Sequence, residues 1–261
     1  MQAASLPMSA GWHWVRDGFG LFKRQPIAMF TWALTIGFLV LVATMIPPIG
    51  PLLFVTLMPV VTVMTLVACR QILAGKAVMP LRLFLILKTP GLAKRLFGMG
   101  AVYVVIVMLA GMVAFLPFMD TLRDALQGVT DDDLSPVLVA MRTPIILFAI
   151  FYVSVAAMFW HAPVLVAWHN LSLRKALFFS AVACWRNKGA FIVYGLVWFG
   201  AVAGLELLGG LLEGIGLPQG VAGLVQMPLN FFAAAVLYCS FYPAYESVFG
   251  EPDTPEAQQM I

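Results

Sequence analysis

Side chains that could do acid–base or transport chemistry are rare in the apolar parts of this sequence, and Glu206 is the main one. It lies deep inside an apolar stretch, where a carboxylate could bind a proton or a cation, or form part of a solute path. Asn230, beside Pro228 in a later stretch, is a second polar candidate. Alternatively, Glu206 reaches toward the nearby end of its stretch, or it is protonated and hydrogen-bonded to Gln226 or Asn230. Glu206 and Asn230 are therefore the candidates for an intramembrane polar site.

The histidines and cysteines do not form a metal or catalytic motif. His161 and His169 lie eight residues apart with Pro163 between them, whereas paired ligands on one helix need the i, i+4 spacing. The three cysteines show no ligand-pair spacing: Cys69, Cys184 and Cys239. The sequence contains no HExxH, no Ser-His-Asp order with a nucleophile elbow and no phosphate-binding loop. We therefore expect no catalytic residue, no metal and no cofactor, and we do not expect an enzyme.

Three adjacent carboxylates, Asp131 to Asp133, could attract a divalent cation. An EF-hand loop, however, needs ligands at alternate positions and a terminal Glu, which this triplet lacks. We therefore interpret the triplet as solvated loop within the acidic connection 118–143, in which Asp120 to Gln127 are expected to form a short helix and Ser135-Pro136 to open another.

The elements that must position these side chains are six apolar stretches, each about long enough to cross a bilayer. They lie at about 27–46, 50–69, 97–117, 144–164, 189–212 and 222–245. Hydrophobic residues make up 62% of the chain and charged residues only 10%, whereas about a quarter of the residues in a soluble domain are charged. The sequence therefore predicts an all-α fold with six transmembrane helices in a single membrane domain over residues 1–261.

The basic residues are distributed unevenly along the chain. Of the 15 Lys and Arg residues, 13 precede the first stretch or follow the second or fourth, and only Arg123 and Arg142 lie on the opposite side. Because Lys and Arg concentrate in cytoplasmic loops, this bias predicts that both termini are cytoplasmic, with residues 246–261 as a cytoplasmic tail. The same topology places the three cysteines near the cytoplasmic side, where thiols stay reduced.

A basic, amphipathic segment precedes each odd-numbered stretch. Residues 9–24 are the clearest case, because Trp12 and Phe19 recur at helical spacing on one face while Arg16 lies on the other. We expect this helix to lie flat at the cytoplasmic headgroups, with tryptophan at the interface.

Three such segments indicate an internal repeat of an interfacial helix plus a transmembrane hairpin. The other two segments run over about 89–95 and 172–188, and residues 22–26 echo residues 185–189. Alternatively, these are the basic segments that any polytopic protein places before its spans.

Small and kinking residues indicate helix contacts and breaks. Gly200 and Gly204 form a GxxxG pattern that permits close helix approach, either within the bundle or between protomers of a homo-oligomer. Pro59 and Pro228 would free backbone carbonyl groups inside their spans, as in the discontinuous helices that line solute sites. Ordinary spans also tolerate proline, so a structural role remains open.

The basic cytoplasmic segments form the best-supported interaction surface. Each Lys or Arg near an anionic leaflet contributes about 1 kcal/mol, and here such residues alternate with apolar anchors. The candidate lipid- or partner-binding residues are Arg82, Lys88, Lys94, Arg95, Arg174, Lys175, Arg186 and Lys188. The same charges also serve as a topology signal. Nucleic-acid binding is not expected, because the sequence has no soluble basic domain.

Two interfacial segments carry a resemblance to a known family. One runs from Trp12 to Pro26, and the other includes Trp168-His169 and the run from Lys175 to Asn187. With these segments the sequence resembles a family of uncharacterised proteobacterial multi-pass inner-membrane proteins, and the resemblance covers most of the chain. It implies a location in the bacterial inner membrane. It implies no particular activity, so no functional residue is carried over.

The sequence leads to two functional hypotheses. The first is a non-catalytic membrane component whose basic cytoplasmic face engages anionic lipid or another membrane protein. The second is a small-solute or ion transporter or channel that uses Glu206 and the proline-broken spans. A hydrated cavity that reaches Glu206 would favour the second hypothesis, and a dry bundle with Glu206 at the lipid boundary would argue against it.

Overall fold

The fold is seen in a computed structural model, which describes residues 3–127, 134–251 and 258. Over these residues the chain is helical and has no strand, so the all-α prediction is confirmed. Six helical segments are long and apolar enough to cross a membrane, and each overlaps one of the stretches predicted from the sequence. The acidic triplet at 131–133 lies outside the described residues.

The helices fall into three consecutive units, each made of a short connecting segment and a long hairpin. Unit 1 contains α1 (Ala10–Arg24), α2 (Pro26–Thr44) and α3 (Ile49–Leu73). Unit 2 contains α4 (Pro80–Leu83), η1 (Phe84–Lys88), α5 (Leu92–Phe115), η2 (Leu116–Phe118), α6 (Met119–Gln127), α7 (Ser135–Phe159) and α8 (Ala162–His169). Unit 3 contains α9 (Leu173–Arg186), α10 (Lys188–Gly214) and α11 (Gln219–Phe249). This order is the one that the repeat hypothesis predicts.

Proline, glycine and asparagine set several helix boundaries. Pro26 is the first residue of α2, where its missing N–H is not needed and its fixed φ suits a helix. Pro47 and Pro48 lie between α2 and α3, where proline cannot extend α2. Gly91 precedes α5 with φ 74°, and Asn170 follows α8 with φ 49°. Both angles are left-handed, a conformation that these two residue types adopt more readily than most.

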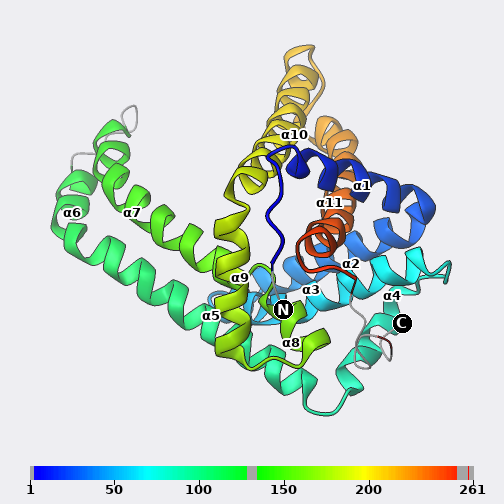
Figure 1. The fold of residues 1–261 in the computed structure, drawn as a ribbon. Coiled ribbons are helices and arrows are strands. Elements are labelled where there is room, and N and C mark those ends of the chain that lie inside the picture. The colour runs from blue at the N-terminus through cyan, green and yellow to red at the C-terminus, as the bar shows by residue number, and fades with distance from the viewer. Residues whose placement is uncertain (1–2, 128–133, 252–257, 259–261) are drawn as a thin grey trace.

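The three units pack in a ring, and each connecting segment lies on the hairpin of the unit before it. α4 contacts α2 and α3, α9 contacts α7 and α8, and α1 contacts α10 and α11. Figure 1 shows the N-terminal segment and the end of α11 in the middle, with α1, α4 and α9 around them. Unit 3 therefore returns to unit 1 through noncovalent contacts.

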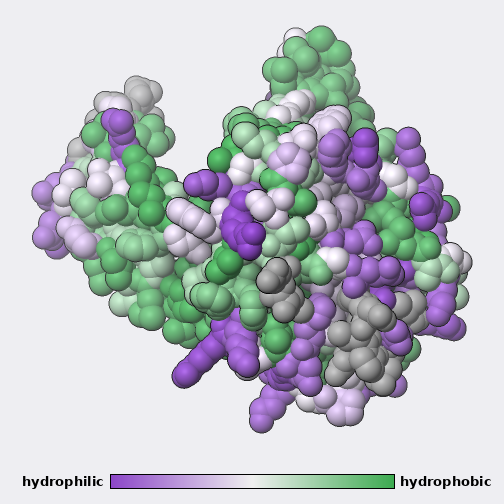
Figure 2. Space-filling model, in the orientation of Figure 1, coloured by the Kyte–Doolittle hydropathy of each residue, from purple (hydrophilic) through white to green (hydrophobic). Residues whose placement is uncertain are grey.

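Two of the three seams between hairpins are closed, and the third is open. α3 packs on α5, and α11 packs on α2. The corresponding pair, α7 and α10, shows no comparable packing among the described residues. In Figure 1 the α5–α7 arm points away from the α10–α11 hairpin, and Figure 2 shows a hollow between the two lobes, both of which carry apolar surface.

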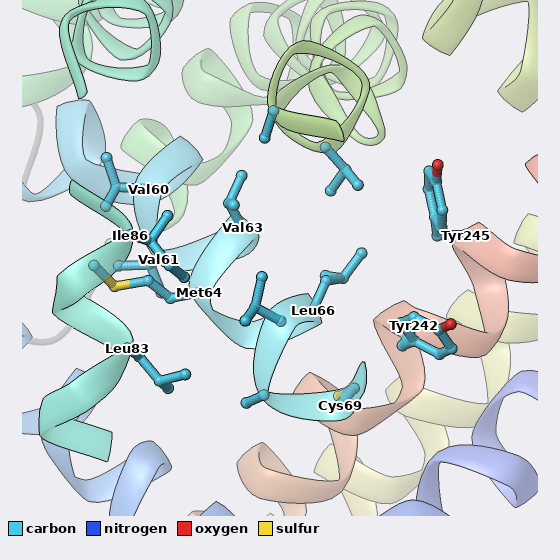
Figure 3. Packing of buried hydrophobic residues seen from close by; sticks show 14 of the residues in the cluster. Val60, Val61, Val63, Met64, Leu66, Cys69, Leu83, Ile86, Tyr242 and Tyr245 are labelled. Carbon is cyan, nitrogen blue, oxygen red and sulfur yellow. The ribbon is translucent and has the colours of Figure 1, made fainter. Parts of the chain in front are cut away.

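α3 lies at the centre of the fold. Figure 3 shows Leu83 and Ile86 of the α4–η1 segment on one side of α3, and Tyr242 and Tyr245 of α11 on the other. α8 contacts α3 and is buried over residues 162–168. The core is therefore built where the ends of the hairpins meet.

α1 has a packed face in addition to the exposed aromatic residues that the sequence analysis placed at the headgroups. A Cβ at Gly11 would overlap the carbonyl oxygen of Ala190, and one at Gly18 would lie 2.6 Å from Cα of Ser240. Both contacts bring the backbone of α1 directly against α10 and α11. Trp12, on the outer side, is 54% exposed. α1 thus anchors unit 1 to unit 3 while it presents aromatic surface outward.

Candidate functional site

Each unit uses one polar side chain near the start of its hairpin to hold the segment that leads into the next connecting helix. In unit 1 this side chain is Gln25, between α1 and α2. Its Oε1 accepts a hydrogen bond from the N–H of Val78 at 2.9 Å, and its Nε2 donates to the carbonyl of Lys76 at 2.6 Å. The segment before α4 is thereby fixed to the start of α2.

Asn187 makes the matching contact in unit 3, between α9 and α10. Its Oδ1 accepts from the N–H of Leu6 at 2.8 Å, and its Nδ2 donates to the carbonyl of Ala4 at 2.9 Å. As with Gln25, the two backbone groups come from residues two apart. The N–H of Ala4 also donates to the carbonyl of Val248 at 2.9 Å. These bonds close the ring between the last unit and the first.

Arg95 takes this role in unit 2, in the first turn of α5. Its guanidinium donates to Oδ1 of Asn170 and to the carbonyl of Leu171, immediately before α9. Arg95 belongs to the predicted lipid- or partner-binding set, and the structure gives it internal partners instead of leaving all its donors to solvent. We therefore treat Arg95 first as a residue that holds the ring together.

A second pair of equivalent contacts supports the relation between units 1 and 3. Nε1 of Trp32, seven residues after Gln25, donates to Oγ1 of Thr65 at 2.9 Å. The hydroxyl of Tyr194, seven residues after Asn187, lies 2.6 Å from Oγ of Ser240. All four residues are buried. In both units an aromatic side chain of the first spanning helix thus bonds a hydroxyl of the second.

The eight predicted basic residues lie on the connecting segments or at the starts of hairpins, and all are exposed. They are Arg82 on α4, Lys88 on η1, Lys94 and Arg95 on α5, Arg174, Lys175 and Arg186 on α9, and Lys188 on α10. Nζ of Lys188 lies 4.8 Å from the ring centre of Trp185. Over the described ranges, none of the eight forms an ion pair. We call the surface that they form the connecting face.

The structure does not bring the intramembrane polar candidates together. Glu206 on α10 and Asn230 on α11 are both exposed. Gln226 donates to the carbonyl of Leu205 at 3.3 Å and packs on Gly209, instead of bonding Glu206. Glu206 therefore lies on the outer surface of α10.

Gly200 and Gly204 do not mediate packing within the described chain. A Cβ at either position would meet no atom within 4 Å. Close helix approach instead occurs at Gly100 of α5, where a Cβ would overlap the carbonyl oxygen of Thr56. The GxxxG pattern is left on an open face of α10.

A cavity of about 400 Å³ lies between the three units. Its walls come from α2, α3, α5, α7, α8 and α11. The walls combine aliphatic residues with seven aromatic side chains: Phe54, Tyr103, Tyr152, Phe159, Trp160, Tyr238 and Phe241. Pro59 and His161 also line the cavity, whereas Glu206 and Asn230 do not. A cavity of this size with a few polar groups is typical of a small-molecule site.

His161 lies at a break between α7 and α8 that the sequence analysis did not identify within its predicted span at 144–164. The backbone N–H of His161 donates to Oγ of Ser180 at 3.0 Å, and that hydroxyl donates to the carbonyl of Ala157 at 2.8 Å. Ser180 thereby satisfies backbone groups that the interrupted helix leaves open. Pro163 was the available signal, because proline has no N–H to continue the helix.

A buried polar cluster at the ends of α3, α8 and α11 was also missed. Arg70 is buried, and its guanidinium carbon lies 5.2 Å from the ring centre of Trp168. Nε2 of His169 lies 2.6 Å from the hydroxyl of Tyr245. In the sequence Arg70 is one of the 13 basic residues that set the charge bias, and nothing local indicates which of these cations is enclosed.

The His, Cys, Asp and Glu side chains of the described residues do not gather into a group of three or more that could hold a metal ion. All three cysteines are buried and unpaired with one another. Burial raises the pKa of the Cys184 thiol on α9 to about 12. Since the thiolate is the reactive form, this thiol is inert at neutral pH.

The chain is 37% identical over 266 residues to a "probable inner membrane protein" of Burkholderia thailandensis. The alignment covers 98% of this chain and 97% of that protein. The chain belongs to this family of inner membrane proteins. The family resemblance seen in the sequence is therefore confirmed, and the six apolar helices make this member a multi-pass protein. No family model matches the chain, and no solved structure matches it.

Proposed function

We propose that this multi-pass inner membrane protein is a non-catalytic component whose connecting face engages anionic lipid. The observation that carries this proposal is the set of exposed cations on that face, which have no carboxylate partner among the described residues. Near an anionic leaflet each such cation contributes on the order of 1 kcal/mol. Apolar residues on the same segments, such as Leu81 and Leu85, are exposed and can anchor the face in the headgroup region.

The proposal includes an orientation in which the connecting face and both termini are cytoplasmic. The charge bias supports it, since 13 of the 15 Lys and Arg residues lie at this end of the hairpins. A C-terminal fluorescent-protein fusion, which folds in the cytoplasm, should be bright in cells. A C-terminal alkaline phosphatase fusion, which needs the periplasm, should be inactive. The reverse pattern would contradict the orientation.

The lipid test compares two double variants in nanodiscs that contain phosphatidylglycerol and phosphatidylcholine. Lys88→Gln with Lys94→Gln removes two exposed charges from the connecting face, and Arg123→Gln with Arg142→Gln removes two from the opposite ends of the hairpins. Retained lipid is counted by native mass spectrometry. At about 1 kcal/mol for each charge, the first variant should lose on the order of tenfold or more in phosphatidylglycerol retention, and the second should match the unmodified protein.

Equal phosphatidylglycerol retention by all three proteins would overturn the lipid proposal. The connecting face also suits an acidic membrane-protein partner, and the open Gly200–Gly204 face suits a second copy of the chain. Co-release of another protein at fixed stoichiometry, lost in the Lys88 and Lys94 variant, would assign the connecting face to that partner instead.

Transport is the second candidate function. Pro59 lines the central cavity, which supports a solute site there. The spans are not broken as predicted, however, because α3 continues as a helix through Pro59 and α11 through Pro228. Glu206 lies outside the cavity, which weighs against the version of this hypothesis that depends on it. If Glu206 is part of a transport path, Glu206→Gln should change ion or solute flux in proteoliposomes, and unchanged flux would remove it from the hypothesis.

A further inference from the structure

The segment formed by α4 and η1 is held firmly against the first hairpin. Leu83 and Ile86 are buried on the side that faces α3 (Figure 3). On the side toward α2, the rings of Phe84 and Trp32 meet edge to face with their centres 6.2 Å apart. The two hydrogen bonds of Gln25 fix the chain just before α4. The surface between α2 and α4 therefore has walls that the fold sets in place.

An apolar groove of about 720 Å³ lies on this surface. Pro26, Ile27 and Ala28 of α2 line it together with Pro80 and Leu81 of α4. Ile27 and Leu81 are 82% and 83% exposed, although both are aliphatic. Because the apolar span of α2 begins at Pro26, the groove lies where headgroups meet acyl chains. An apolar chain in the groove would cover both side chains.

A polar pocket of about 570 Å³ adjoins the groove. Gln71, Lys76 and Thr89 are among the residues that line it. Met79 and Arg82 line both the pocket and the groove, so the two lie side by side. Lys76 and Arg82 are exposed, and the described lining residues of the pocket and the groove include no Asp or Glu. The pocket therefore suits an anionic group next to the apolar groove.

Arg82 stands at the junction of the two hollows. Its guanidinium makes no hydrogen bond or ion pair with the described residues. A guanidinium presents its N–H groups in a planar fork that matches the oxygens of a phosphate. Arg82 is thus placed to bind a phosphate whose apolar part enters the groove.

The corresponding place in unit 3 is covered by the protein itself. Gly189 follows Asn187 by two residues, and Met8 packs directly on it, since a Cβ at Gly189 would lie 2.7 Å from Cγ of Met8. Ile27 follows Gln25 by two residues and is left open instead. The groove is therefore a feature of unit 1 and does not recur in unit 3.

We propose that one anionic phospholipid binds here, with an acyl chain in the groove beside α2 and its phosphate on Arg82 and Lys76. This inference rests on the proposed function, because it gives the anionic lipid of the connecting face a defined site. A free phosphate would leave the groove empty, and an uncharged lipid would leave both cations without a counter-charge.

The probes are phosphatidylglycerol with a photoactivatable diazirine in its acyl chain and phosphatidylcholine with the same chain, each added to the protein in nanodiscs. Labelled residues are located by peptide mass spectrometry. Phosphatidylglycerol should label the groove residues of α2 and α4 at least fivefold more than phosphatidylcholine does. Equal labelling by the two probes would overturn the proposal.

Two variants that remove the same charge separate this site from general attraction to the connecting face. Arg82→Gln should lower groove labelling by phosphatidylglycerol about fivefold, which corresponds to about 1 kcal/mol. Arg174→Gln, on α9 and outside both hollows, should leave it unchanged. Equal losses in the two variants would overturn the site while leaving the broader lipid proposal intact.

A second pair of variants tests the groove without changing the charge. Thr31→Trp places a large ring at an exposed position that lines the groove, and labelling of Ile27 and Leu81 should be lost. Leu34→Trp adds the same ring to α2 at an exposed position outside the groove and should have no effect. Unchanged labelling in Thr31→Trp would overturn the proposal.

Competition with the unmodified protein does not depend on a variant that must fold. Unlabelled phosphatidylglycerol should displace the labelled probe from the groove, whereas an equal concentration of glycerol 3-phosphate should not. Equal displacement by glycerol 3-phosphate would show that the pocket binds the phosphate alone, which would overturn the assignment to a lipid.

Discussion

α3 and α10 are both long apolar helices, yet the ring encloses one and exposes the other. In their most apolar windows 56% of the α3 residues are buried inside the protein, against 6% for α10, although the mean hydropathies are 2.4 and 1.9. α3 packs against α2, α5, α8 and α11, whereas α10 packs mainly against α1 and α11. Hydropathy therefore predicts which helices can cross a membrane, while position in the ring decides which of them form the core.

The same contrast separates the closed seams from the open one. At the α3–α5 seam the helices approach until Gly100 touches backbone, whereas Gly200 and Gly204 on α10 face open space. Close packing in a membrane comes from van der Waals contact between small residues, since lipid is as apolar as the helices. A small residue thus stabilises a seam only where a partner helix is present.

The largest expected effect comes from filling a closed seam. Gly100→Leu would drive α5 away from Thr56, and we expect a loss of about 3 kcal/mol or more in the free energy of unfolding. Gly200→Leu meets no atom and should be neutral or slightly stabilising, because leucine favours a helix more than glycine does. Thermal unfolding in one detergent compares the two. Similar losses would contradict the assignment of a closed and an open face.

An intermediate loss of stability is expected when Asn187 or Gln25, which hold the segments between units, is replaced. Asn187→Ala removes three hydrogen bonds at a buried site and should destabilise the protein by about 2–3 kcal/mol. Gln25→Ala removes two bonds at a less buried site and should cost about 1 kcal/mol. Asn230→Ala, at an exposed position, serves as the control and should leave the free energy of unfolding unchanged. If Asn187→Ala were also silent, the N-terminal segment would not be held as the structure shows.

The smallest expected effect distinguishes buried from exposed tryptophan. Trp32→Phe loses the bond to Thr65 inside the first hairpin and should cost about 1 kcal/mol, because the threonine hydroxyl keeps its backbone partner. Trp12→Phe changes an exposed ring on α1 and should stay within about 0.5 kcal/mol. The measurement is again the unfolding midpoint in detergent. A larger loss at Trp12 would indicate that α1 packs through its outer side.

The helices were predictable from the sequence because their signals are local. Long uncharged runs, prolines at helix starts and glycines at turns act within a few residues of one another, and all six spans were found in this way. The bias of basic residues is equally visible, since it requires only the order of the charges along the chain.

The ring was not predictable in detail, because its contacts join distant residues. Arg95 looked like any juxtamembrane cation, and its bonds to residues 75 and 76 positions later depend on how two units pack. Burial of Nε2 of His161 without a hydrogen-bond partner likewise arises only once α10 and α11 pack around its ring. The face of α1 that packs on the protein was missed for the same reason, because it includes Trp14, Leu21 and Phe22 and nothing local shows which apolar residues of α1 meet α10 and α11 rather than lipid.

Because Asn187 holds unit 3 against unit 1, the three units could be joined in a different order along the chain while keeping the same contacts between them. Units 3 and 1 meet through side-chain and backbone bonds at Ala4, Leu6 and Val248, in the way that covalently joined units meet. A circularly permuted gene that started at α4 and joined the end of α11 to residue 3 through a short linker would preserve every hairpin and its direction. The contact between the end of α11 and residues 4–6 is, in this sense, equivalent to the covalent links from α3 to α4 and from α8 to α9.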